Sequence, residues 1–375
     1  MKTKIDFIYR GEHRFCWPVF LLTIGIAIFG IIMVYSASLY TAEKTYGDAM
    51  FFATKQIVGV ILGIASMIFC YFVNYQWLRK IGWVALIVGF VVLAIVFIPG
   101  VGIESYGARR WIGFGSFSFQ ASEIAKFCFI IFAATYMATN HQKMGTFKGA
   151  LPVILAGAGM CLLIILEPNM SITICVGVLM VVMLLVGGMR LKHLILMAIP
   201  ALALIPVLII LEPYRLLRLM AFLDPWASPQ GEGFQLIQSL YSLGAGGWFG
   251  VGLFDSRQKY SFLPFSESDF IFSIIGEELG FVGCLFLVGA FVALIYYGFK
   301  IAIRAKDRFG CYLATGITTI LAVQVVLNIA VVTGSIPPTG LPLPLISAGS
   351  TSLIMFMAGL GILLNIYRQS RKQSL

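Results

Sequence analysis

Charged residues are scarce in this sequence. Only 11% of its 375 residues are Asp, Glu, Lys or Arg, whereas 60% are hydrophobic, and the mean hydropathy is +0.96. A water-soluble domain has roughly a quarter of its residues charged, so most of the surface of this protein must face something other than water. The composition therefore excludes a soluble protein and predicts a polytopic membrane protein whose apolar surface is covered by lipid.

Histidine and paired cysteines are also lacking. The histidines are His13, His141 and His193, and the seven cysteines lie singly inside apolar stretches. No zinc-ligand cluster, CxxC redox pair or disulfide framework can be drawn from them. The sequence contains no GxGxxG or Walker motif, which argues against a nucleotide site. The net charge of +10 needs no nucleic acid to explain it, because basic loops at a membrane account for it.

Long apolar runs are abundant. A window of about 19 residues suits a hydrocarbon layer of roughly 30 Å. It places ten runs near residues 18–38, 53–73, 81–99, 121–139, 150–166, 170–189, 192–211, 270–299, 310–333 and 345–367. We therefore predict an all-α polytopic protein of about ten transmembrane helices, with residues 1–375 forming a single domain and both termini on one side.

The basic residues are distributed unevenly between the two sides. Of the 26 Lys and Arg residues, 17 fall in the termini and the even-numbered connections, whereas 13 of the 16 acidic residues fall on the other side or in the outer parts of helices. The positive-inside rule places the basic side in the cytoplasm. Two long segments, 100–120 and 212–269, would then lie outside the cell, the second of them as a large loop between helices 7 and 8.

Polar residues gather at the predicted outer ends of the fourth and fifth helices. Arg109 and Arg110 precede the fourth helix, and Glu123 and Lys126 are three residues apart on one of its faces. This pair either neutralises itself so that the helix can enter the membrane, or lines a cavity, as ionisable groups inside spans usually do. Glu167, in the block EPNMS, is either a helix-end group in contact with water or part of the same cavity.

The large loop brings further charges to the same side. Arg215 and Arg218 are three residues apart in a stretch rich in Leu, Met and Phe, which is typical of an amphipathic helix in the headgroup plane. Its basic face would meet phosphates, either of ordinary lipid or of a substrate. Arg257 and Lys259 follow, and Asp269 comes ten residues after them.

Asp269 directly precedes the apolar run of the eighth helix. It is either a helix N-cap or part of a functional site, and Glu277 and Glu278 are carried into the same span. Three acids and two bases at one membrane boundary exceed what capping needs. The segment 333–352 carries four prolines and no charge. Irregular backbone at membrane depth must be satisfied by protein or by a water-filled cavity, so we expect this segment to line one wall of an outer cavity.

Blocks of sequence along nearly the whole chain, in this order, resemble the SEDS family (shape, elongation, division and sporulation), the group of RodA, FtsW and SpoVE. Each block alone is weak, but the set is specific. The DPW and GGWFGVGL motifs resemble the division and sporulation branches of the family more than they resemble RodA. The blocks are MVYSAS, FFATKQ, GARRWIGFGSFSFQASEIAK, EPNMS, FLDPWASPQGEGFQLIQSLYSLGAGGWFGVGL, SRQKYSFLP, SDFIFSIIGEELGF and TGLPLPLISAGSTSL.

The resemblance implies a ten-helix glycosyltransferase of the bacterial cytoplasmic membrane. Such an enzyme polymerises lipid II into glycan strands at the outer face, releases undecaprenyl pyrophosphate, and works beside a class B penicillin-binding transpeptidase. The essential Asp of the family falls on Asp269. Its paired Glu and Lys fall on Glu123 and Lys126, and its basic motif on Arg109 and Arg110.

These roles define an expected mechanism. Asp269 would be the general base, provided that burial or the neighbouring Glu277 and Glu278 raise its proton affinity. A divalent metal ion (Mg²⁺ or Mn²⁺) bridging Asp269 and the pyrophosphate is the alternative, as a Lewis acid; no other cofactor is expected. Glu123, Glu167, Glu277 and Glu278 are the candidate supporting carboxylates. The candidate groups for binding the pyrophosphate are Arg109, Arg110, Lys126, Arg215, Arg218, Arg257 and Lys259.

Two other functions fit the same charges. One is a transporter (flippase) of a lipid-linked precursor, since intramembrane charges and a broken helix also suit alternating access; the sequence shows no inverted repeat. The other is a non-catalytic scaffold that recruits a transpeptidase. Four positions depart from the family pattern: Phe265 stands where Glu is usual, Asn169 where Asp is frequent, and Ala348 and Ser350 where Tyr and Gly are common.

Overall fold

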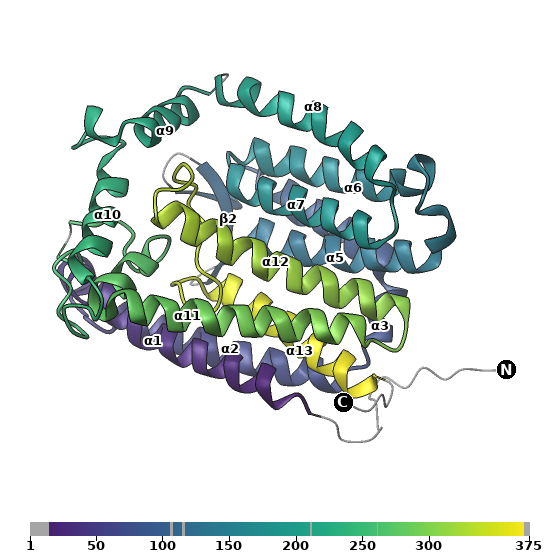
Figure 1. The fold of residues 1–375 in the computed structure, drawn as a ribbon, viewed down its shortest axis with the longest axis horizontal. Helices are drawn as coiled ribbons and strands as arrows, with labels where there is room; N and C mark the ends of the chain where they lie inside the picture. The colour runs from purple at the N-terminus through teal and green to yellow at the C-terminus, as the bar shows by residue number, and fades with distance from the viewer. Residues whose placement is uncertain (1–14, 106–107, 115–116, 211, 261, 371–375) are drawn as a thin grey trace.

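Ten apolar helices lie in the part of the chain that the structure describes, as the sequence predicts. The computed structural model describes residues 15–105, 108–114, 117–210, 212–260 and 262–370. Within these ranges seven helices are long and apolar enough to cross a membrane, and three shorter apolar helices accompany them. In chain order the ten are α1 (Trp17–Tyr46), α2 (Phe51–Phe72), α4 (Gly82–Ile95), α5 (Ala121–Thr139), α6 (Phe147–Leu166), α7 (Met170–Val186), α8 (Leu191–Ile210), α11 (Ile271–Ile303), α12 (Arg308–Val332) and α13 (Ser350–Gln369) (Figure 1).

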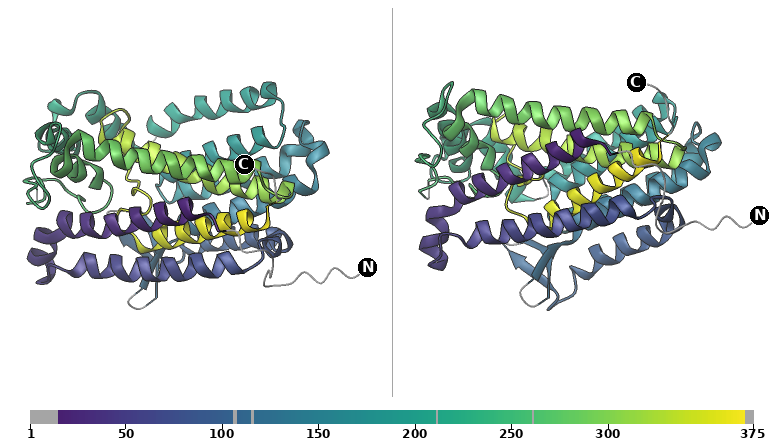
Figure 2. Two further views of the ribbon diagram at one scale, coloured as in Figure 1. Left: turned by 60° about the horizontal axis from the view of Figure 1, so that its bottom comes forward. Right: turned by 90° about the horizontal axis from the view of Figure 1, so that it is seen from below.

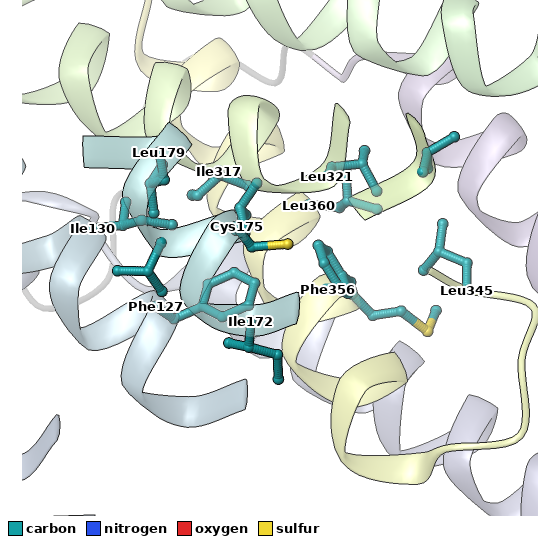
Figure 3. Packing of buried hydrophobic residues seen from close by; sticks show 14 of the residues in the cluster. Phe127, Ile130, Ile172, Cys175, Leu179, Ile317, Leu321, Leu345, Phe356 and Leu360 are labelled. Carbon is teal, nitrogen blue, oxygen red and sulfur yellow. The ribbon is translucent and has the colours of Figure 1, made fainter. Parts of the chain in front are cut away.

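The centre of the bundle is made by α5, α7, α12 and α13. Two thirds of the most apolar stretch of α12 is buried, which is typical of a helix surrounded by protein. Outer helices instead expose large apolar side chains such as Leu155, Leu162 and Ile199 to the surroundings, as expected of a lipid-facing surface. The side chains that meet in the centre include Phe127, Ile130, Cys175, Leu179, Ile317, Leu321, Phe356 and Leu360 (Figure 3).

Both ends of the described chain lie at the same end of the bundle. Tyr71, at the end of α2, contacts the ring of Phe15 just before α1 and the guanidinium of Arg368 in the last turn of α13. The hydroxyl of Tyr75 donates a hydrogen bond to Asp307, in the connection between α11 and α12, at 2.7 Å. An even number of spans is confirmed by this arrangement. Basic residues of the termini, counted above for the orientation, lie outside the described residues: Lys2, Lys4, Arg10, Arg14, Arg371 and Lys372.

The segment before α5 folds as a small antiparallel sheet, which the sequence analysis did not predict. Its strands β1 (Gly102–Ser105), β2 (Ala108–Phe114) and β3 (Phe117–Gln120) pair in the order β1-β2-β3, and the sheet projects from one side of the bundle (Figure 2). A search for long apolar runs does not detect strands of four to seven residues, because their signal is alternation with a period of two.

The segment between α8 and α11 is largely helical at first and irregular afterwards. The amphipathic helix expected around Arg215 and Arg218 is confirmed as α9 (Pro213–Leu223), and it is followed by η2 (Pro225–Ala227) and α10 (Phe234–Gly246). Short helices α3 (Gln76–Lys80) and η1 (His141–Lys143) occupy connections at the opposite end.

The proline-rich segment 333–349 runs between α12 and α13 without regular structure. The predicted span near 345–367 therefore begins later, at Ser350, because this segment does not continue the helix. Side chains from the spans satisfy its carbonyl groups. Gln324 donates to Pro342 at 3.0 Å, Asn328 donates to Leu341 at 2.6 Å, and Gln56 of α2 donates to Ile346 at 3.1 Å. Protein hydrogen bonds thus replace water around this irregular backbone, as burial among helices requires.

Candidate active site

Asp269 lies at the junction of the large loop with α11. The helix begins at Ile271 after Phe270, and no side chain caps it, so Asp269 does not act as an N-cap. Its main-chain oxygen accepts a hydrogen bond from Asn328 of α12 at 2.8 Å. Its carboxylate lies against Gly340 of the proline-rich segment, where an added Cβ would stand 3.2 Å from Oδ2. The side chain is partly exposed.

Charged groups from two other parts of the chain, and a neighbour in the same loop, act on the Asp269 carboxylate. Burial raises the pKa of Asp269 to about 6. The charge of Glu267 also raises this pKa, whereas Arg218 and, more weakly, Arg110 lower it. The pKa of Glu267 is itself raised, chiefly by burial. A carboxyl group with a pKa near 6 is ionised at neutral pH and is still a better proton acceptor than an ordinary aspartate.

The arginines near Asp269 are held in place by main-chain oxygens. Arg110, from β2, donates to the carbonyl oxygens of Glu167 at 3.2 Å and of Pro168 at 2.6 Å, at the break between α6 and α7. Arg218, from α9, donates to the carbonyl of Pro338 at 3.2 Å. These carbonyl contacts orient the two guanidinium groups, and both cations act electrostatically on Asp269.

Two further predicted arginines are more peripheral. Arg215 donates to the carbonyl oxygen of Ile165 at 3.4 Å, near the end of α6. Arg109 is exposed, and it precedes Arg110 on a strand, so the two side chains leave opposite faces of the sheet.

Glu167 is a second carboxyl group of the site. Its side chain is 1% exposed, and neither carboxylate oxygen has a hydrogen-bond partner among the described residues. Burial raises its pKa to about 8, and Arg110 offsets only part of that effect. Glu167 is therefore largely protonated at neutral pH, so it contributes little negative charge beside the arginines.

Glu123 and Lys126 form a buried ion pair in α5. Their side chains are 0% exposed, and the ammonium nitrogen lies 2.7 Å from Glu123 Oε1. The same ammonium donates to Gln324 Oε1 at 2.7 Å, and the amide nitrogen of Gln324 donates to Pro342. The pair is thus connected through Gln324 to the proline-rich segment that carries Gly340.

The other predicted charges gather around the first turns of α11. Lys259 lies 3.5 Å from Glu278, and Ser36 of α1 donates to the same carboxylate at 2.5 Å. Ser256 and the main-chain nitrogen of Arg257 donate to Glu277 at 2.5 and 2.8 Å. These bonds fasten the loop 247–259 to α11 and α1, and the side chain of Arg257 is exposed. The structure thus places Lys259, Glu277 and Glu278 in a cluster separate from the groups that act on Asp269.

Two residues that the sequence analysis did not single out, Gln324 and Asn328, contact the site directly. They are four residues apart on α12, so they lie on one face of that helix. The sequence does indicate these two residues as candidates, because two side-chain amides four residues apart interrupt an otherwise apolar span. Their carbonyl partners at 269, 341 and 342 could not be read from the sequence, since they come from segments brought together only by packing.

The carboxylates near Asp269 include two that are candidates for binding a divalent metal ion. Among the described residues, no group of three or more His, Cys, Asp or Glu side chains is arranged to hold one. Mg²⁺, however, is commonly bound by one or two carboxylates together with substrate phosphates and water. Asp269 and Glu267 could supply such a pair.

The fold and the site together define a polytopic α-helical membrane protein with a charged site at one end of its bundle. Residues 16–372 match the family described as cell cycle protein, that of FtsW, RodA and SpoVE. The chain belongs to this family, the SEDS family.

Relatives with known names are similar over almost their full length. Stage V sporulation protein E of Bacillus subtilis (strain 168) is 39% identical over 353 residues, which cover 94% of this chain and 96% of that protein. A protein of Geobacter metallireducens named probable peptidoglycan glycosyltransferase FtsW is 36% identical over 355 residues, which cover 94% and 95%.

Solved structures share the fold. A chain of a complex described as "Structural coordination of polymerization and crosslinking by a peptidoglycan synthase complex" superposes with a TM-score of 0.78 at 28% identity, covering 96% of this chain and 99% of that one. The rod shape determining protein RodA of Thermus thermophilus superposes with a TM-score of 0.70 at 25% identity, with the same coverage.

Proposed function

We propose that this protein is a peptidoglycan glycosyltransferase that polymerises lipid II and releases undecaprenyl pyrophosphate. Membership of the SEDS family and the names of its relatives support the reaction class. The observation that carries the assignment of the site is the convergence on Asp269 of two cations, Arg218 and Arg110, which come from different segments of the chain. One base and one stabiliser of the departing pyrophosphate suffice for transfer of a sugar from such a donor, and a carboxylate beside two cations supplies both.

The reaction joins two lipid-linked sugars. The 4-hydroxyl oxygen of the acceptor GlcNAc forms a bond to the anomeric carbon of a donor MurNAc, and the bond between that carbon and the pyrophosphate oxygen breaks. Asp269 accepts the hydroxyl proton, for which its pKa of about 6 suits it at neutral pH. The bonding electrons leave with the pyrophosphate, whose developing charge Arg110 and Arg218 stabilise. Direct displacement at an α-linked donor gives a β-linked product by inversion.

The remaining charges have supporting roles in this proposal. Arg109 and Arg215 extend the cationic surface for the pyrophosphate, and Glu167 remains protonated so that it does not repel the substrate. As the alternative to the general-base role of Asp269, a divalent cation, Mg²⁺ or Mn²⁺, would be held by Asp269 and Glu267 and would act as a Lewis acid on the pyrophosphate. In this proposal Lys259, Glu277 and Glu278 do not contact the substrate, and their role is to hold the loop 247–259 against α11 and α1.

The proposed location is the bacterial cytoplasmic membrane, with the site facing outward. The positive-inside rule supports this orientation, because basic residues such as Lys300, Arg304 and Arg308 lie at the end of the bundle opposite to Asp269. The proposed partner is a class B penicillin-binding transpeptidase. The similarity to a chain of a peptidoglycan synthase complex supports this choice.

The proposal is tested by lipid II polymerisation with the purified protein, alone and with its candidate transpeptidase. Asp269→Ala should abolish glycan strands. Asp255→Ala, which removes an exposed carboxylate of the same loop, should retain them. A chelator arm with Mg²⁺ or Mn²⁺ added back tests the metal ion.

Full polymerase activity in a correctly inserted Asp269→Ala protein would overturn the site. If the wild type makes no strands while it binds its partner, vesicle assays of lipid II movement would decide between a flippase and a scaffold.

A further inference from the structure

Three successive carbonyl groups of the chain around Asp269 accept hydrogen bonds, two of them from the proline-rich segment. The nitrogen of Ala348 donates to the carbonyl of Glu267 at 2.9 Å. The hydroxyl of Ser347 donates to the carbonyl of Ser268 at 2.6 Å. The next carbonyl, that of Asp269, is bound by a side chain from a third element, Asn328 of α12.

Asn328 joins the two segments at the point closest to the carboxylate. Its amide nitrogen donates to the carbonyl of Asp269 at 2.8 Å and to that of Leu341 at 2.6 Å, so both of its N–H groups are used. Leu341 follows Gly340, the residue against which the Asp269 carboxylate lies. Gly340 has φ +71°, a conformation that glycine adopts without strain. One side chain therefore fixes the carbonyl of Asp269 and the backbone that its carboxylate contacts.

The oxygen of the same amide points to a role other than stability. Asn328 is 1% exposed, and its Oδ1 has no hydrogen-bond partner among the described residues. A buried amide oxygen without a partner lowers the stability of the fold. Costly local arrangements of this kind are typical of residues kept for function.

We infer that Asn328 is a positioning residue that holds Asp269 in register with the segment 340–348 during sugar transfer. This inference rests on the proposed function. Asn328 acts on the main chain of Asp269 and need not touch the substrate. Its loss should therefore lower the rate of the chemical step more than it weakens substrate binding, because a small misplacement of a reacting group can cost up to about 100-fold in rate.

The chain offers a matched control at the opposite end of the bundle. Asn365 of α13 is 0% exposed, and its amide bonds to main-chain groups of Tyr71 and Tyr75. Asn365→Ala and Asn328→Ala thus remove similar buried amides, one far from Asp269 and one beside it. Asn328→Asp keeps the side-chain volume while removing both N–H donors, which separates lost hydrogen bonds from lost packing.

The test measures kcat and KM for lipid II with the full-length protein and its transpeptidase, together with the melting temperature of each variant. We expect kcat of Asn328→Ala and Asn328→Asp to fall roughly 10- to 100-fold, with KM within about threefold of wild type. Asn365→Ala should show a comparable loss in melting temperature but a kcat within about twofold of wild type. Equal losses of kcat in the two alanine variants, or an unchanged kcat in Asn328→Ala, would overturn the inference.

Hydrogen–deuterium exchange provides a readout that does not depend on activity. Asn328→Ala should exchange faster than wild type in peptides covering 266–270 and 340–344, and Asn365→Ala should not. Unchanged exchange in both peptides would refute the positioning role even if activity fell. If the wild type makes no glycan strands, the proposed function fails, and exchange alone decides whether Asn328 holds the main chain of Asp269.

Discussion

Replacing Lys126 by methionine should destabilise the protein strongly. The ammonium of Lys126 lies 2.7 Å from a carboxylate oxygen of Glu123, and both side chains are 0% exposed. At this separation, with an effective dielectric constant of about 20, the Coulomb attraction is roughly 6 kcal/mol. Desolvation of the two ions offsets much of it, but removing one partner leaves the other as an uncompensated buried charge. Such changes cost about 3–5 kcal/mol.

Within the part of the chain that the structure describes, the carboxylate of Glu123 has no other partner that could compensate for the loss of the Lys126 ammonium. Glu123 Oε2 has no hydrogen-bond partner among the described residues, so neighbouring donors do not replace the lost ammonium. Adding Glu123→Gln to Lys126→Met removes the stranded charge and should restore most of the lost stability. The difference between single and double variants therefore measures the charge itself rather than the altered packing.

Thermal unfolding in detergent, followed by the fluorescence of a thiol-reactive dye, would measure these changes. Lys126→Met should lower the midpoint by about 5 °C or more, since 1 kcal/mol shifts the midpoint of a large domain by about 2 °C. Lys192→Met, which removes an exposed lysine, should change it little. A single variant as stable as wild type, or a double variant no better than the single, would refute the reasoning.

Three further predictions concern the site and its support. Because Asp269 must be ionised to accept a proton and its pKa is about 6, kcat/KM at pH 5 should be roughly a tenth of that at pH 7; initial rates independent of pH over this range would contradict the base assignment. Arg218→Gln removes the charge that most strongly lowers this pKa, so the acidic limb of the same profile should move to higher pH, and a shift to lower pH would be the wrong sign. Gly246→Ala would drive a Cβ into the carbonyl oxygen of Gly276 and should cost about 1–3 kcal/mol in thermal unfolding, whereas Gly244→Ala in the same helix meets open space and should not.

The spans were predictable because their signal is long and local. Each of the ten apolar runs became a helix, since a hydrocarbon layer leaves few alternatives for a backbone without water. The predicted ends were less accurate. The first helix continues to Tyr46 rather than ending near residue 38, because a hydropathy window stops where the composition becomes polar, whereas a helix can continue into the interface.

The candidate site was predictable in its charges but not in its connections. Asp269, Glu167 and the arginines stand out as ionisable groups near apolar runs. Their grouping depends on which loops meet at the end of the bundle, and this is set by packing between elements far apart in sequence. For that reason the ion pair of Lys259 with Glu278 could not be read from the sequence.

Three of the four departures from the family pattern lie where a contact is made by the main chain, where the new residue makes the same kind of contact, or where a nearby residue supplies a similar group. Asn169 accepts a hydrogen bond from the nitrogen of Ile172 at 3.3 Å and caps α7, as an Asp would also do. Ala348 contributes its main-chain nitrogen to the carbonyl of Glu267, a bond that does not depend on its side chain. Phe265 removes a carboxylate, but Glu267 places one where its charge raises the pKa of Asp269. A carboxylate two residues further along the chain therefore acts on Asp269, so Phe265 is compatible with the proposed chemistry.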